Sequence, residues 1–97
     1  MRSLFYALDN KKVVHPVDNL TEWGTKWRKN RRVALTNVLG TTVSTVFLGI
    51  DHSFGHGAAP MLFETMVFPT SELIGRCSTW QEAKELHERA VQRIKSS

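Results

Sequence analysis

The sequence predicts an α+β domain with a mainly antiparallel sheet of four to five strands and two helices packed on one face of that sheet. Three observations predict it. Segments rich in β-branched and aromatic residues follow one another through the middle of the chain, short turns separate them, and two helical patterns begin with capping residues. Short connections favour antiparallel neighbours. The 97 residues suit a single domain, 1–97, with one modest core.

The N-terminal segment is predicted to form a hairpin. Residues 3–8 look like a strand, residues 9–12 like a turn, and residues 13–17 like a second strand. Asp and Asn suit the turn because they bond their own backbone and tolerate left-handed angles. Pro16 cannot donate to a β-ladder, so the second strand is expected to be short and at an edge.

A first helix is predicted over residues 19–30. Asn19 and Glu22 have the spacing of a capping box, which satisfies two free amide donors. Trp23 and Trp27 fall on one face of this helix and are expected to anchor it to the sheet.

The next block is rich in strands. The four segments expected to pair are residues 32–38, 42–50, 61–68 and 73–78. A second helix then starts from a capping box made by Thr79 and Glu82. Its apolar face carries residues at helical spacing, namely Ala83, Leu86, His87, Ala90, Val91 and Ile94.

Composition excludes several classes of protein. The hydrophobic fraction of 41% is that of a folded globular chain rather than a disordered one. No apolar run reaches the roughly 20 residues that span a bilayer, and the N-terminus lacks the pattern of a secretory signal. Cys77 is the single cysteine, so no intrachain disulfide can form. These features fit a soluble cytoplasmic protein with no membrane partner.

The net charge of +4 is concentrated in one segment. The basic run, residues 26–32, holds five cations and no acid: Lys26, Arg28, Lys29, Arg31 and Arg32. Cations of this kind could hold phosphates while exposed tryptophans stack on bases. The simpler interpretation is a solvated helix side, with the tryptophans turned to the sheet. Contact with a partner or with nucleic acid is therefore a hypothesis for this run.

The segment between the second and third strands of the block, residues 51–60, is about twice as long as a usual hairpin loop. Asp51, His52 and His56 in this loop, with Glu64 on the next strand, offer oxygen and imidazole ligands. No metal-ligand spacing is present, so no metal and no cofactor is predicted. The alternatives are a candidate metal or catalytic site and a glycine-rich loop whose histidines bond locally.

Three further side chains have alternative roles. Glu64 is expected to pair with Arg76 across a hairpin rather than to act as a catalytic carboxylate. Cys77 is expected to be structural, although a neighbouring cation could activate its thiol. His87 is expected to be a core or interface histidine. No nucleophile-elbow motif is present, and no catalytic residue is predicted.

Three stretches, "VSTVFLGIDHSFG", "PMLFETMVF" and "CSTWQEAKELH", resemble a family of short uncharacterised phage and prophage proteins. Members of that family typically show "STVFLGLDH", then "P-x-LFETMVF", then "R-x-STW-x-EA". The resemblance spans most of the chain and carries no assigned activity. It implies a bacterial host cytoplasm under phage or prophage control.

The resemblance implies a small non-enzymatic accessory protein that binds a host macromolecule. The expected partner is a host protein, and inhibition of a host defence complex, as by anti-CRISPR proteins, is one such role. Many of those inhibitors are acidic, and the net charge of +4 departs from that pattern. Two alternatives stand: a nucleic-acid-binding protein using the basic run, and a small metal-dependent enzyme using the loop at 51–57. A monomer and a homodimer are both compatible with the sequence.

Overall fold

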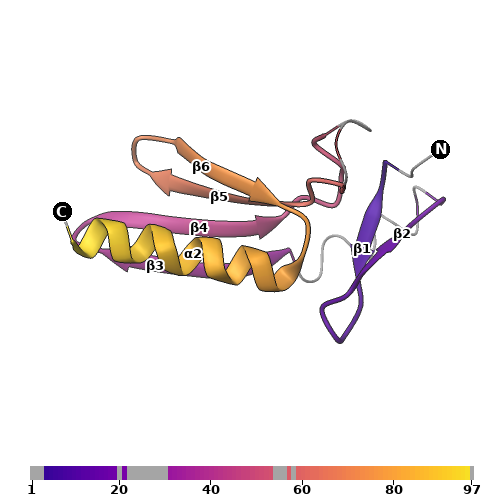
Figure 1. Ribbon diagram of the computed structural model, residues 1–97, viewed down its shortest axis with the longest axis horizontal. Coiled ribbons are helices and arrows are strands. Elements are labelled where there is room, and N and C mark those ends of the chain that lie inside the picture. The colour runs from indigo at the N-terminus through magenta and orange to yellow at the C-terminus, as the bar shows by residue number, and fades with distance from the viewer. Residues whose placement is uncertain (1–3, 20, 22–30, 54–56, 58, 97) are drawn as a thin grey trace.

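The computed structural model describes residues 4–19, 21, 31–53, 57 and 59–96. Its class is α+β, as predicted, with strands in two sheets and a helix at the C-terminal end (Figure 1). The described elements are β1 (Tyr6–Leu8), β2 (Val14–Pro16), β3 (Arg32–Val38), β4 (Thr41–Phe47), β5 (Phe63–Phe68), β6 (Glu72–Cys77) and α2 (Trp80–Lys95). Residues 22–30, which hold most of the first predicted helix together with Trp23 and Trp27, lie outside the described residues.

The main sheet has four antiparallel strands in chain order, β3-β4-β5-β6. The four strands predicted in the middle of the chain are confirmed. The second of them, β4, ends at Phe47 rather than at residue 50. Gly49 has φ 75°, in the left-handed region, and Ile50 instead forms an isolated bridge to Phe5.

The predicted N-terminal hairpin is confirmed, but it does not extend the main sheet. Strands β1 and β2 form a separate two-stranded sheet at one end of the molecule (Figure 1). Two backbone hydrogen bonds hold it there. The N–H of Tyr6 donates to the carbonyl of Gly49 over 2.8 Å, and the N–H of Asp51 donates to the carbonyl of Leu4 over 2.8 Å. The main sheet therefore has four strands, the lower of the two numbers predicted, and the hairpin adds no fifth strand to it.

Helix α2 covers one face of the main sheet and contacts all four of its strands (Figure 1). The predicted capping box is present, since Thr79 Oγ1 accepts from the N–H of Glu82 while the Glu82 carboxylate accepts from the N–H of Thr79. The helical residues buried against the sheet are Ala83, His87, Ala90 and Val91, all on the predicted apolar face.

The core lies between α2 and the alternate positions of β4 and β5 that point toward it. Phe47 and Phe63 are fully buried, with ring centroids 5.3 Å apart. Trp80, at the start of α2, meets Phe63 edge to face with centroids 6.4 Å apart. Burial of side chains of this size contributes about 1.5–3 kcal/mol each, so this cluster fixes the helix on the sheet.

A polar network crosses the core beside these rings. The buried His87 bonds Thr45 Oγ1 through Nδ1 over 2.8 Å and Thr36 Oγ1 through Nε2 over 2.9 Å. Thr45 Oγ1 also bonds Thr65 Oγ1 over 2.6 Å. His87 is thus the core histidine that the sequence predicts. Its two ring nitrogens both have partners, as buried polar groups require.

The described helix is too short and too polar to cross a membrane, so the structure contains no candidate membrane-spanning helix in the described residues.

Candidate protein-binding surface

The sheet face opposite α2, hereafter the open face, is not covered by any described element. Strand pairing aligns its side chains in rows across the four strands. One row is Leu35, Ser44, Met66 and Leu73, in the order β3 to β6. In the part of the chain that the structure describes, α2 is the element that contacts these strands, and it lies on the other side. The row of apolar side chains therefore has no cover from a described element.

Two leucines of this row are strongly exposed. Leu35 is 57% exposed and Leu73 is 45% exposed, while Met66 between them is half-buried. A single exposed leucine is ordinary in a folded protein, but several apolar side chains together on one sheet face are typical of a surface that binds another molecule. The next row toward the hairpin turns adds Phe68, which is 39% exposed opposite Thr42.

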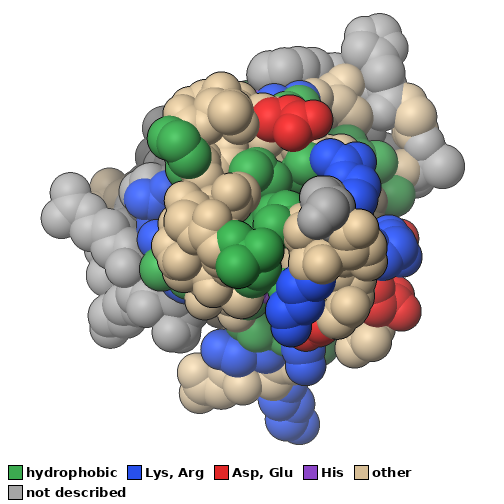
Figure 2. All heavy atoms as spheres, turned by 90° about the vertical axis from the view of Figure 1, so that its left-hand side faces the viewer, with side chains coloured by type: hydrophobic (Ala, Val, Ile, Leu, Met, Phe, Trp, Pro, Cys, Tyr) green, Lys and Arg blue, Asp and Glu red, His purple; other side chains and the backbone are tan. Residues whose placement is uncertain are grey.

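The β3–β4 turn places one more apolar side chain at the end of the sheet. Leu39 and Gly40 form a two-residue turn with φ 54° and 82°, and Leu39 is 84% exposed. Turns with two positive φ angles favour Asn-Gly, because a leucine Cβ clashes in the left-handed region. Figure 2 views this end of the molecule and shows apolar side chains gathered near its centre. Leu39 is thus both strained and unburied.

Charged groups bound the open face at its other end. Arg76 Nε donates to Glu64 Oε2 over 3.0 Å, which confirms the predicted cross-strand pair. Arg32, the first residue of β3, is exposed opposite Val46 in the same row. Glu64 therefore lies on the open face in an ion pair and not at the long loop.

The basic run divides between described and undescribed residues. Arg31 and Arg32 are exposed at the start of β3, and the carbonyl of Arg31 accepts from the N–H of Phe47. Lys26, Arg28 and Lys29 lie outside the described residues. A contact role for the run as a whole stays a prediction.

The loop after β4 is organised by a buried carboxylate. Asp51 is 1% exposed, and its Oδ1 accepts from the N–H of Ser53, the hydroxyl of Ser53 and the N–H of Met61, over 2.8, 2.6 and 2.9 Å. The bond to Met61 joins the two ends of the loop. Asp51 therefore has a structural role, which is to hold the two ends of the loop together.

Of the two histidine candidates in the loop, the structure describes His52. His52 Nδ1 bonds the carbonyl of Ile50 over 2.9 Å, the local bonding expected for a loop histidine, and His56 lies outside the described residues. No group of three or more His, Cys, Asp or Glu residues gathers in metal-binding proximity within the described ranges. His15, far from this loop in sequence, bonds Asp9 Oδ2 through Nε2 over 2.7 Å.

The Cys77 thiol is not activated by its neighbour. Burial, with a smaller contribution from Glu82, raises the pKa of Cys77 to about 11. Arg76 points to the open face, where it pairs with Glu64, whereas Cys77 packs with the core cluster. The possibility of an Arg76-activated thiol is therefore wrong, and the structural role predicted for Cys77 fits its surroundings.

The sequence of β5 carries a signal for the open face that sequence motifs do not reveal. In β5, apolar side chains occur at both alternate sets of positions, with Phe63 and Val67 on one face and Met66 and Phe68 on the other. A strand covered on one side usually alternates apolar and polar residues. Apolar residues on both faces indicate a second contact surface.

A comparison of the chain with protein-family models, with curated proteins and with solved structures finds no match.

Proposed function

We propose that this chain is a small non-enzymatic protein that binds a host protein through the open face and the β3–β4 turn. The observation that carries the proposal is the set of apolar side chains on this face: Leu35, Met66 and Leu73 in one row, in which Ser44 separates Leu35 from Met66, with Phe68 and Leu39 nearer the turns. Interfaces bury apolar side chains at their centre and leave charged groups at the rim. The Glu64–Arg76 pair and Arg32 would form that rim.

Leu39 supports the proposal in a second way. A left-handed backbone costs a non-glycine residue roughly 1–2 kcal/mol. Leu39 gains almost no burial within the chain in return, because it is 84% exposed. Strained residues that the fold does not need tend to occur at binding sites. A partner that covers Leu39 supplies the missing burial.

The setting we propose is a bacterial cell carrying a phage or prophage, with inhibition of a defence complex as the specific role. The sequence resemblance supports this setting. The alternative function, nucleic-acid binding through the basic run, is favoured by the exposure of Arg31 and Arg32 at the start of β3. The two proposals use different surfaces and can be separated by experiment.

The test uses the tagged full chain and lysate of a bacterial host, divided into nuclease-treated and untreated halves. Three variants are compared with the natural chain: Leu39→Asn, the double variant Leu35→Asp with Leu73→Asp, and Lys84→Gln as a control on the outer side of α2. We expect one host protein to be retained in both halves by the natural chain and by the control. Both open-face variants should lose it.

Leu39→Asn gives the sharpest result because it should affect folding and binding in opposite directions. Asparagine tolerates the left-handed region, so the variant should be about 1 kcal/mol more stable than the natural chain in urea unfolding. Loss of the partner by a more stable protein cannot arise from misfolding. Unchanged capture by both open-face variants would refute the proposal, and capture that disappears on nuclease treatment would favour nucleic acid.

A further inference from the structure

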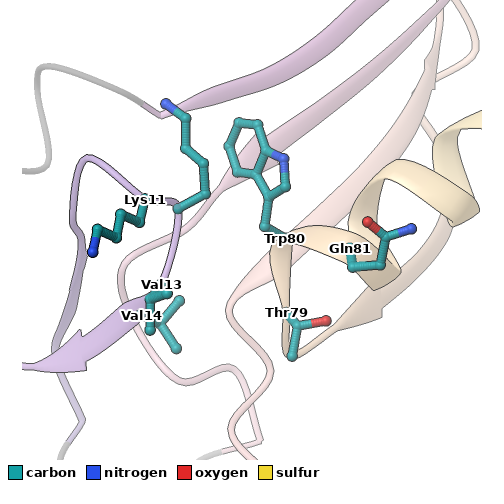
Figure 3. A pocket seen from close by; sticks show the side chains of 7 residues that line it. Lys11, Val13, Val14, Thr79, Trp80 and Gln81 are labelled. Carbon is teal, nitrogen blue, oxygen red and sulfur yellow. The ribbon is translucent and has the colours of Figure 1, made fainter.

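A groove lies between the N-terminal hairpin and the start of α2 (Figure 3). The hairpin and this end of α2 lie at the end of the molecule away from the β3–β4 turn (Figure 1). Its volume is about 370 Å³, within the range of small-ligand pockets. The hairpin contributes one wall and the first turn of α2 the other. The lining residues are Lys11, Lys12, Val13, Val14, Thr79, Trp80 and Gln81.

The hairpin wall has a fixed shape because Asp9 holds the turn. Its Oδ1 accepts from the N–H of Lys11 over 2.8 Å and from the N–H of Val13 over 3.0 Å, and its Oδ2 bonds His15. The carbonyl of Asp9 also accepts from the N–H of Lys12 over 3.0 Å. Since backbone bonds fasten the hairpin to Gly49 and Asp51, both walls are held in place without a ligand.

Lys12 occupies a strained position in this turn. Its φ is 66°, where glycine or asparagine would form the turn without strain. Its ammonium lies 4.9 Å from the centre of the Trp80 ring, a contact worth about 0.5–1 kcal/mol at an exposed site. That contact at most offsets the strain, so the hairpin gains little stability from a lysine here. The side chain does place a positive charge at the indole wall of the groove.

The groove combines positive charge with an apolar lining. Lys11 and Lys12 are its charged lining residues, and no acidic residue lines it among those that the structure describes. The nearest acid of α2, Glu82, is engaged by the N–H groups of Ser78 and Thr79. In Figure 3, Val14 and Trp80 line the groove from its two sides, while Lys11 extends from the turn on the outer side.

We propose that this groove binds a small organic anion with a flat apolar body. The body would lie between Val14 and Trp80, and a phosphate or carboxylate group would meet the Lys12 ammonium. The site is separate from the open face and does not depend on the protein partner proposed above.

The test follows the two-dimensional ¹⁵N–¹H spectrum of the labelled full chain during titration with four probes. Adenosine 5′-monophosphate and indole-3-acetate carry both the flat body and the anion, one as phosphate and one as carboxylate. Adenosine supplies the body alone and inorganic phosphate the anion alone. The readout is the indole N–H of Trp80 and the backbone amides of Val14 and Thr79, which report on this groove and not on the open face.

We expect at least one of the two complete probes to shift these signals saturably, with adenosine and phosphate at least about ten-fold weaker. A response to adenosine monophosphate alone would identify phosphate as the anionic group that the groove prefers. A response to indole-3-acetate alone would identify carboxylate as that group. Lys12→Asn keeps the turn and should weaken binding about ten-fold, since an ionic hydrogen bond is lost. The control Lys84→Gln, on exposed α2, should bind as the natural chain does.

Three results would overturn the proposal. One is the absence of a saturable shift with any probe up to millimolar concentration. Another is equal affinity for adenosine and adenosine monophosphate, which would remove the role of charge. The third is unchanged affinity in Lys12→Asn, provided its spectrum shows that the hairpin is intact.

Discussion

Replacement of Thr45 by valine tests the account of the core directly. Thr45 is fully buried on β4, and its hydroxyl serves two neighbours, Thr65 over 2.6 Å and His87 over 2.8 Å. Valine has almost the same shape, so it leaves the packing intact and removes only the hydroxyl. The His87 ring nitrogen and the Thr65 hydroxyl then lose a partner in a place that water does not reach.

The size of the expected loss in stability follows from the two polar groups left without a hydrogen-bond partner. Each unsatisfied buried polar group costs about 1–3 kcal/mol, so the loss of partners for two groups should lower the free energy of unfolding by about 2–6 kcal/mol. That loss is a large part of the total stability of a small domain, about 5–15 kcal/mol. The measurement is urea-induced unfolding followed by circular dichroism, with the midpoint and the slope compared between variants.

Thr42→Val is the matched control. Thr42 lies on the same strand but on the open face, where its hydroxyl accepts from Asn37 Nδ2 over 3.1 Å in an exposed position. Its replacement should change the free energy of unfolding by no more than about 0.5 kcal/mol. If Thr45→Val were as stable as the natural chain to within the same margin, the network would contribute nothing and the reasoning would be refuted.

Three further predictions concern titratable groups. Burial lowers the pKa of His87 below its ordinary 6.5, although Glu88 opposes this, so the unfolded chain binds the proton more readily than the folded chain. The contribution of His87 to stability should therefore be complete above pH 6.5 and fall as the pH decreases through that value. His87→Gln should show a smaller pH dependence of the free energy of unfolding between pH 7 and 5 in the same assay. Asp51→Ala removes the acceptor of three hydrogen bonds at a buried position and should lower the free energy of unfolding by about 3 kcal/mol or more, whereas Asp51→Asn, which keeps an acceptor oxygen, should lose less. Burial raises the pKa of Cys77 to about 11. Iodoacetamide should therefore alkylate Cys77 at pH 8 on the order of 100-fold more slowly than it alkylates a free thiol. Alkylation at the rate of a free thiol would contradict the structural role.

The features that were predicted correctly depend on residues close together in sequence or on simple strand pairing. The capping box of Thr79 and Glu82 spans three residues, and its geometry is set by the helix itself. The pairing of Glu64 with Arg76 follows from a short hairpin between two strands. Such features need no knowledge of the rest of the fold.

The features that were missed depend on tertiary placement. The hydrogen bonds that Ser53 donates to the Asp51 carboxylate are local in sequence. The hydrogen bond from the N–H of Met61 to the same carboxylate requires the two ends of the loop to meet. The bulge in β6, between Leu73 and Gly75, directs Ile74 to the helix side; a glycine inside a strand is compatible with a bulge, but the position of this one is set by the pairing with β5. The main ladder of β4 ends at Phe47, and beyond it Ile50 bridges to Phe5 of the N-terminal segment, a long-range contact that the local sequence does not mark.

Each of the two proposed sites contains a non-glycine residue with a positive φ angle. The non-glycine residues with positive φ among those described are Lys12, Leu39 and Ser71. Ser71 is a small turn residue, but Lys12 and Leu39 carry long side chains where asparagine or glycine would give a more stable turn. Each places its side chain where the fold itself gains little: Leu39 in solvent and Lys12 over a groove. Because local rules are broken chiefly where function requires it, the same two positions are where substitution should improve stability and impair binding.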